Sequence, residues 1–142
     1  MARRKTSMLV TIGTGTGEDK IASAKSLAHG ILFSIDSQNP DEVIFFGSKE
    51  SLKTLDFLKE QYIKKFSHEF EDYEFIEIDR IDSFEEYFTA FKNKIEELDG
   101  NKIVIDYTSG TKTMTMSAAF ASMLYHKNLI FVSGKRENGI VV

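Results

Sequence analysis

Residues 8–17 read MLVTIGTGTG, an apolar run followed at once by glycines that alternate with threonines. Met8–Ile12 predicts a buried β-strand, because a short apolar run bounded by a turn signal suits a strand inside a parallel sheet. Gly13–Gly17 can adopt positive φ values and lets backbone N–H groups approach an anion closely. A plain strand-to-helix turn would need the glycines but not the hydroxyls of Thr14 and Thr16. We therefore interpret the segment as a loop for a phosphate-bearing ligand, with the next helix aiming its N-terminus at the same point.

The alternation of strand and helix continues along the chain. Further strands are predicted at Val43–Phe46, Phe75–Ile78, Ile103–Ile105 and Leu129–Val132. Helices are predicted over residues 21–35, 52–66, 84–98 and about 112–125, where apolar residues recur at helical spacing. This order predicts an α/β fold, a Rossmann-like three-layer sandwich whose mostly parallel sheet has the strand order 3-2-1-4-5. The pair Asn138-Gly139 predicts a C-terminal antiparallel hairpin, in which Ile140–Val142 pairs back on the fifth strand.

Composition sets the broad class of the protein. The chain has 142 residues, 42% of them hydrophobic, which is ample for one core. Its net charge of −4 gives no basic field for long nucleic acid. The absence of cysteine fits a reducing cytoplasm, and no apolar run reaches the roughly 18 residues of a membrane span. We expect a cytoplasmic domain over residues 7–142, preceded at 1–6 by a basic flank or expression remnant; a membrane tether outside this chain stays open.

A second loop with ligand-binding character follows the fourth predicted strand. Residues 106–112 read DYTSGTK and open a helix with three hydroxyls, one glycine and one ammonium group. A lysine at a helix N-terminus faces the positive end of the helix dipole, which makes sense if an anion sits there. Helix capping by a hydroxyl of this loop is expected as well, and Asp106 has a structural alternative as an acceptor for N–H groups of the first loop. The two loops converge where the strand order reverses, the usual ligand position in such sheets.

Standard nucleotide-binding and catalytic motifs do not fit these loops. The dinucleotide fingerprint needs a glycine at position 18, which is Glu, and a P-loop needs a glycine directly before Lys112, where Thr111 stands. A nucleophile elbow would need a glycine in place of Tyr107. The histidines have no metal-ligand spacing, so no metal site is expected.

The chain resembles the CRISPR-associated Rossmann fold (CARF) domain, the sensor module of type III CRISPR ancillary proteins. The resemblance covers nearly the whole sequence, and the second loop with its lysine is its most specific part. It rests on residues 11–17 (TIGTGTG), 45–48 (FFGS), 106–114 (DYTSGTKTM), 132–136 (VSGKR) and 138–141 (NGIV).

The resemblance implies a homodimeric sensor that binds cyclic oligoadenylate across its two-fold axis, with cyclic tetra-adenylate as the expected ring and with no cofactor. In this interpretation the first loop cradles phosphate and ribose, and Lys112 neutralises phosphate. The hydroxyls of the second loop bind phosphates or adenine edges. The expected ligand-binding residues are Gly13, Thr14, Gly15, Thr16, Gly17, Gly47, Ser48, Asp106, Thr108, Ser109, Gly110, Thr111 and Lys112.

An enzymatic alternative uses the same pocket. Some members of the family cleave their ring slowly without metal, by positioning a ribose 2′-hydroxyl in line with its own phosphate. Ser109 and Lys112 are the candidate catalytic residues for such a ring nuclease, with Lys112 stabilising the developing charge.

The helix over residues 112–125 is the candidate dimer seam, because it begins at the second loop. Met116, Ala119, Phe120 and Met123 could supply adaptable apolar contacts, although the same residues could instead pack on the sheet. Family members usually carry an effector, but this sequence holds no ribonuclease motif, metal cluster or membrane span. We expect a stand-alone member or the sensor part of a longer protein, the latter slightly favoured because Val142 ends within the predicted hairpin.

Overall fold

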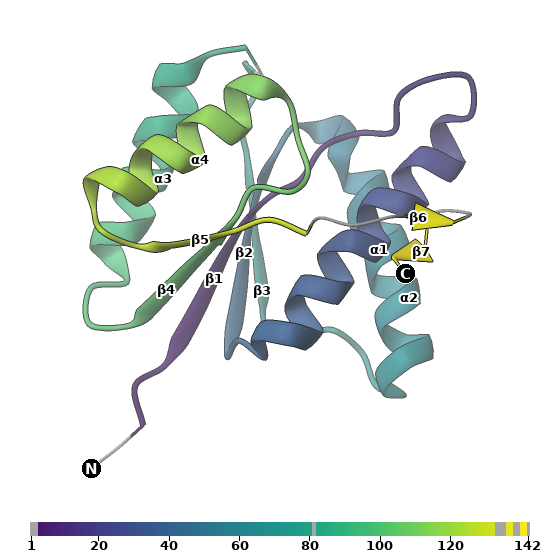
Figure 1. Cartoon of the computed structure of the whole chain (residues 1–142), viewed down its shortest axis with the longest axis horizontal. Helices are drawn as coiled ribbons and strands as arrows, with labels where there is room; N and C mark the ends of the chain where they lie inside the picture. The colour runs from purple at the N-terminus through teal and green to yellow at the C-terminus, as the bar shows by residue number, and fades with distance from the viewer. Residues whose placement is uncertain (1–2, 81, 133–135, 138–139, 142) are drawn as a thin grey trace.

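The computed structural model describes residues 3–80, 82–132, 136–137 and 140–141. Its main sheet has five parallel strands in the order β3-β2-β1-β4-β5, which confirms the predicted order (Figure 1). The strands are β1 (Thr6–Thr11), β2 (Glu42–Gly47), β3 (Tyr73–Glu77), β4 (Lys102–Asp106) and β5 (Asn128–Ile130). The helices are α1 (Lys20–Gln38), α2 (Leu52–Phe66), α3 (Phe84–Glu97) and α4 (Lys112–Leu124), with a 3₁₀ turn at Lys49–Ser51 before α2.

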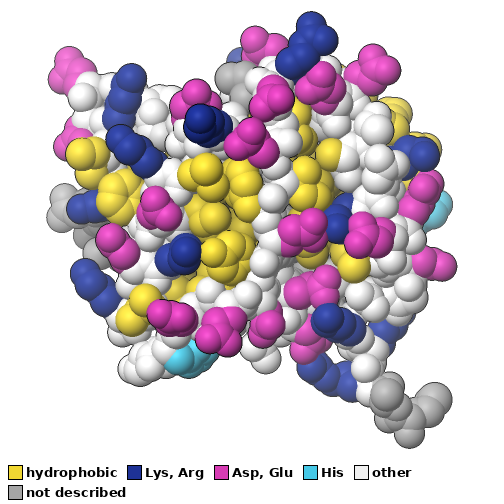
Figure 2. Space-filling model, turned by 180° about the vertical axis from the view of Figure 1, so that it is seen from behind, with side chains coloured by type: hydrophobic (Ala, Val, Ile, Leu, Met, Phe, Trp, Pro, Cys, Tyr) yellow, Lys and Arg dark blue, Asp and Glu magenta, His cyan; other side chains and the backbone are white. Residues whose placement is uncertain are grey.

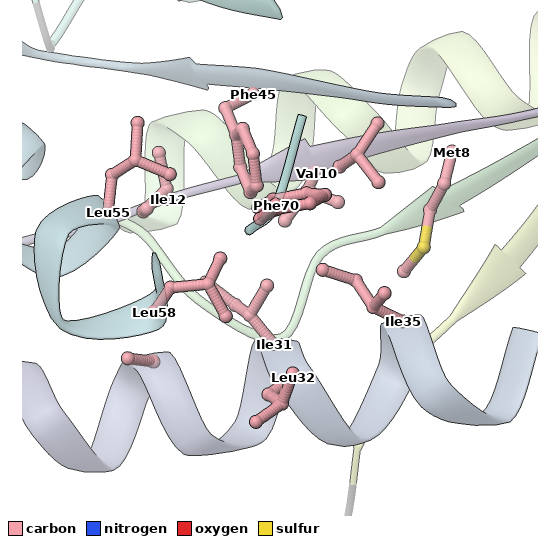
Figure 3. Packing of buried hydrophobic residues seen from close by; sticks show 12 residues of the cluster. Met8, Val10, Ile12, Ile31, Leu32, Ile35, Phe45, Leu55, Leu58 and Phe70 are labelled. Atoms are coloured by element: carbon pink, nitrogen blue, oxygen red, sulfur yellow. The ribbon is translucent and has the colours of Figure 1, made fainter. Parts of the chain in front are cut away.

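The helices cover both faces of the sheet and make a three-layer sandwich. One apolar cluster lies between the sheet and the pair α1 and α2, where Met8 and Val10 of β1 meet Ile31 of α1 and Leu58 of α2 (Figure 3). The other lies under α3 and α4, where Phe46 of β2 stacks on Phe91 with 4.2 Å between ring centroids. The uninterrupted burial of β1 and β2 follows from this arrangement, because a central parallel strand is covered on both faces.

The β3 edge of the sheet lies on the face seen from behind, where acidic side chains surround exposed apolar patches (Figure 2). Glu74 and Glu77 of β3 are exposed, and Glu74 pairs with the buried Lys94 of α3 at 2.9 Å. Charged side chains on an edge strand oppose pairing with another strand. The two exposed glutamates therefore disfavour extension of the sheet at this edge.

The C-terminal pairing is antiparallel, as expected, but its partner strand differs from the expectation. β6 (Arg136–Glu137) pairs antiparallel with β7 (Ile140–Val141) in a separate two-stranded sheet, so residues 140–141 do not pair back on the fifth strand. The predicted turn Asn138-Gly139 lies outside the described residues. Residues 133–135 of the VSGKR segment (132–136) lie outside them as well. β5 ends at Ile130 rather than Val132, because the Val132 N–H bonds to the Thr108 hydroxyl at 2.7 Å instead of continuing the ladder.

The basic start of the chain lies against the beginning of β2. Arg3 pairs with Asp41, and Lys5 pairs with Glu42 at 2.6 Å. Within the described residues, none of the helices is both long and apolar enough to span a membrane.

Tyr87 gives a test of the core under α3. Its ring is fully buried, and its hydroxyl finds no hydrogen-bond partner among the described residues. We expect Tyr87→Phe to leave the free energy of unfolding unchanged or to raise it by about 1 kcal/mol or less, because it removes an unsatisfied polar group without opening a cavity. Urea denaturation near neutral pH checks this, and a loss of several kcal/mol would mean that the hydroxyl has a partner.

The same variant has a pH signature. Burial raises the pKa of Tyr87 from 10.0 to about 12, so the folded protein holds this proton more tightly than the unfolded chain. The proton's contribution to stability is therefore intact below the ordinary pKa and is lost as the pH rises toward the folded value. Wild-type stability should fall more steeply than that of Tyr87→Phe between about pH 10 and 12.

Candidate functional site

The first and fourth strands bring the two predicted loops together. β1 pairs with β2 on one side and with β4 on the other, and Val10 lies opposite Asp106 at the carboxyl ends. The chain order reverses between β1 and β4, so the loops that leave these two strands start side by side at the carboxyl end of the sheet and lead to helices on opposite faces (Figure 1). The structure thus brings Gly13, at the start of the first loop, against Ser109 and Gly110 of the second.

The two loops are in direct contact through Gly13. The Gly13 N–H donates to the Ser109 hydroxyl at 2.9 Å, and the Thr11 hydroxyl donates to the Ser109 carbonyl. A Cβ on Gly13 would stand 2.9 Å from both Cα and N of Gly110, so only glycine allows this approach. Gly110 itself has φ +114°, a conformation that a side chain rarely adopts. Gly13 and Gly110 therefore join the loops into one unit.

Ser109 and Asp106 serve this architecture first. The Ser109 side chain is 2% exposed, with its hydroxyl held by Gly13. Asp106 is fully buried and accepts the Thr108 N–H at 2.8 Å, so it supports its own loop rather than the first loop. Its second carboxylate oxygen has no hydrogen-bond partner among the described residues. Burial raises the pKa of the Asp106 carboxyl, and the nearby Ser34 and Thr108 groups offset only part of that rise.

Gly47 and Ser48 hold the end of β2 behind the first loop. The Gly47 carbonyl accepts the Ile78 N–H at 2.8 Å, and the Ser48 carbonyl accepts the Ser51 hydroxyl at 2.6 Å. Both residues are buried. Gly47 also leaves no room for a side chain, because a Cβ would stand 2.8 Å from the carbonyl oxygen of Ile12. Their observed contacts are structural.

Thr54 is a site residue that the sequence interpretation missed. It lies on α2, is fully buried, and its hydroxyl donates to the Gly13 carbonyl at 2.8 Å. The Gly13 residue is thus fixed from both sides, by Ser109 at its N–H and by Thr54 at its carbonyl. The sequence shows only that Thr54 is a hydroxyl residue next to Leu55, on the apolar side of the predicted helix. This position indicates burial but does not identify Gly13 as the hydrogen-bond partner.

The end of β5 and the residues that follow it contact the second loop, which the sequence did not predict. The Tyr107 N–H donates to the Ile130 carbonyl at 3.2 Å, and Val132 N–H donates to the Thr108 hydroxyl at 2.7 Å. Thr108 therefore uses its side chain as an acceptor for this segment. The ring of Tyr107 contacts the ring of Phe131, with 5.3 Å between the centroids.

The two helix N-termini at the site differ in charge. Asp19 caps α1 and accepts the Ala22 N–H at 2.9 Å, so a carboxylate already occupies that positive dipole end. At α4, Thr111 caps the helix by accepting the Met114 N–H at 3.2 Å. The first turn of α4 is fully described and holds no acidic side chain, and within the described residues the exposed Lys112 makes no ion pair. Of these two helix N-termini, that of α4 is therefore the one without a carboxylate cap.

Two hydroxyl groups of the first loop are not used within the described part of the chain. Thr14 is half-buried and Thr16 is exposed, and neither hydroxyl makes a hydrogen bond within the described part of the chain. The Thr16 N–H donates to Ser23 at 3.1 Å, which steadies the loop. Gly15 packs against the Lys20 backbone, whereas Gly17 has φ +84° and open space around it. The first loop thus offers neutral donors, and the second offers the positive charge.

One hollow of the described chain has an acidic lining. A hollow of about 280 Å³ lies at the amino-terminal end of the sheet, and its acidic lining would repel phosphate. Among the described residues, no group of three or more histidine and acidic side chains is placed to hold a metal ion. The acidic residues that line the hollow are Asp36, Asp41, Glu69, Glu71 and Asp72.

Residues 26–141 match the family described as the Csa3 CRISPR-associated Rossmann-like domain. No curated protein sequence matches the chain.

Several solved structures share the fold. Can2 from Sulfobacillus thermosulfidooxidans, in complex with cyclic tetra-adenylate, superposes with a TM-score of 0.66 at 12% identity over 90% of this chain and 32% of that one. Enterococcus italicus Csm6, bound to cyclic hexa-2′-fluoro-hexa-dAMP, gives 0.63 at 16% identity over 92% and 34%. Protein VC1899 from Vibrio cholerae gives 0.56 at 15% identity over 90% and 30%. The chain spans about a third of the length of these proteins.

The Thr54 contact can be tested directly. Thr54→Val keeps the shape but removes the donor to the Gly13 carbonyl, so we expect the free energy of unfolding to fall by about 1–3 kcal/mol. Thr54→Ser keeps the hydroxyl and should lose less. Urea denaturation followed by circular dichroism measures both, and equal losses in the two variants would show that the hydroxyl is not the stabilising group.

Proposed function

The chain belongs to the Csa3 family of CRISPR-associated Rossmann-like domains, and from this we propose that it is a cyclic oligoadenylate sensor in type III CRISPR antiviral defence. The expected ring is cyclic tetra-adenylate, bound where two copies of the chain meet. The observation that carries the proposal is the α4 N-terminus, where Lys112 and the free helix end face no acidic side chain of the described first turn. This combination favours phosphate, and the joined loops around Gly13 hold it in a fixed position.

The size of a cyclic ligand supports a two-fold assembly. A ring of four nucleotides has more phosphates than one lysine and two short loops can meet. A two-fold axis doubles the donors and matches the symmetry of an even-numbered ring. In this assembly both copies would place their α4 N-termini around one ligand.

The outer face of α4 is the proposed dimer surface. Met116, Phe120 and Met123 are 63%, 50% and 75% exposed, so these three do not bury themselves on the sheet. Phe120 contacts the rings of Phe84 and Phe88 on α3, which extends the apolar surface to the neighbouring helix. Ala119 lies half-buried within the same face. Apolar surface of this kind is typical of a protein–protein interface.

Binding is better supported than ring cleavage. Ser109, one of the two candidates for a ring nuclease, is nearly buried and its hydroxyl is held by Gly13. Lys112 alone could stabilise charge but would not take up the proton of a ribose hydroxyl while it remains protonated. We therefore propose a sensor, and chromatography of the ligand after a binding experiment distinguishes it from an enzyme.

The ligand site is tested at Lys112. We expect Lys112→Ala to weaken binding of cyclic tetra-adenylate by about 1.5–3 kcal/mol and to flatten its salt dependence, because one charged contact is lost. Lys64→Ala on α2 removes the same charge near the other end of the sheet and should bind normally. Calorimetric titration and thermal melting measure both. A collapse of stability with unchanged affinity would make Lys112 structural, and an inert wild type would overturn the proposed function.

The assembly is tested on α4. We expect the wild type to have twice the chain mass of 16.1 kDa in light scattering, and Phe120→Asp with Met123→Asp to reduce it to the single-chain mass. Ile63→Asp is a matched control, because Ile63 is 46% exposed on α2, away from this face. A dimer that survives the α4 substitutions would move the interface elsewhere, and a wild-type monomer with and without ring would refute the dimer.

A further inference from the structure

An aromatic pair lies beside the second loop. Asp106 and Ile130 are paired in register between β4 and β5, so the next residues, Tyr107 and Phe131, are neighbours across the end of the sheet. Their rings are tilted by 32° with 5.3 Å between centroids. Tyr107 is half-buried against the cluster under α3 and α4, which gives the pair a fixed base.

The pair is anchored to the ligand loop itself. The Tyr107 N–H donates to the Ile130 carbonyl at 3.2 Å, on one side of Phe131. On the other side, the Val132 N–H donates to the Thr108 hydroxyl at 2.7 Å. Phe131 is therefore held from both flanks by the same loop that ends at Lys112. A side chain ordered in advance costs little entropy when a ligand binds it.

About half of the surface of Phe131 is exposed and is not packed against the described residues. Its side chain is 53% exposed although it is a large apolar ring. It lines a hollow of about 360 Å³ together with Phe33 and Ser34 of α1 and with Val132. Ser37 and Gln38 complete the polar part of that lining. An apolar ring beside amide and hydroxyl groups matches a nucleobase, which has an apolar face and a hydrogen-bonding edge.

Resting on the proposed function, we propose that Phe131, backed by Tyr107, is a stacking platform for one adenine base of the bound ring. The base lies against Phe131 in the hollow beside α1, while the phosphates lie at the α4 N-terminus. The segment that carries Phe131 is joined to the loop that ends at Lys112 by the Val132 N–H bond to the Thr108 hydroxyl. Base stacking and phosphate binding thereby come from separate side chains and can be measured separately.

Substitution of Phe131 tests the platform by calorimetry with cyclic tetra-adenylate. We expect Phe131→Ala to weaken binding about tenfold, which corresponds to about 1.4 kcal/mol, while Phe131→Tyr keeps near wild-type affinity. The salt dependence of binding should have the same slope in Phe131→Ala as in the wild type, because no charge is removed. Lys112→Ala should show the opposite pattern, with a reduced slope.

A fluorescence experiment reports contact with the base directly. The sequence contains no tryptophan, so Phe131→Trp introduces a single emitter at the platform. We expect cyclic tetra-adenylate to quench this emission through stacking. Ile63→Trp, at a position 46% exposed on α2, is the matched control and should keep its emission.

The outcomes separate this inference from the proposed function. A wild type that does not bind the ring overturns the proposed function. A wild type that binds, with unchanged affinity in Phe131→Ala and unquenched Phe131→Trp, overturns the platform alone. If Phe131→Ala instead loses the dimer mass in light scattering, Phe131 belongs to the contact between copies and the platform is again overturned.

Discussion

The contact of Gly13 with Ser109 and Gly110 is the constraint on which the site depends. The two loops approach so closely that a Cβ on Gly13 would stand 2.9 Å from the Gly110 backbone. Gly13 is fixed from both sides, because its N–H donates to the Ser109 hydroxyl and its carbonyl accepts from the Thr54 hydroxyl. Because β1 and β4 are neighbouring central strands, this contact is set by the sheet and not by flexible loops. The site is therefore preorganised, and a ligand need not bring its two halves together.

That constraint divides the polar residues of the loops into two groups. Asp106 and Ser109 are buried and hold backbone N–H groups of the loops, whereas Lys112 and Thr16 remain exposed. The two groups cannot be told apart in the sequence, because all four residues are polar and stand in glycine-containing loops. What separates them is burial, which follows from strand register. Asp106 ends β4 opposite Val10 and is fully buried, while Lys112 lies in the first turn of α4 and is exposed.

The sequence predicted the fold more fully than the site, for physical reasons. Short apolar runs such as Met8–Ile12 report burial on both faces of a strand, and the helical spacing from Phe84 to Leu98 gave α3 to within one residue. Tertiary contacts leave no such periodic signal. Thr54 reaches Gly13 across 41 residues of chain, and Val132 reaches Thr108 across 24. The end of β5 was missed for the same reason, because a side chain and not a strand takes the Val132 N–H.

Charge placement explains how an acidic chain can favour an anion. The net charge is −4, yet the N-termini of α1 and α4 differ in the charge of the residues beside them. Asp19 neutralises the N-terminus of α1, while the N-terminus of α4 carries a neutral threonine cap followed by Lys112. Because such local fields fall off within about one helical turn, the overall charge matters less than these few groups. In the proposed site the first loop would act through shape and neutral donors, and the second loop through charge. If α4 also forms the seam between two copies, the cationic ends of both copies come near one axis, where a ring of phosphates would offset their mutual repulsion. Ligand and dimer would then stabilise each other through the same electrostatic interaction.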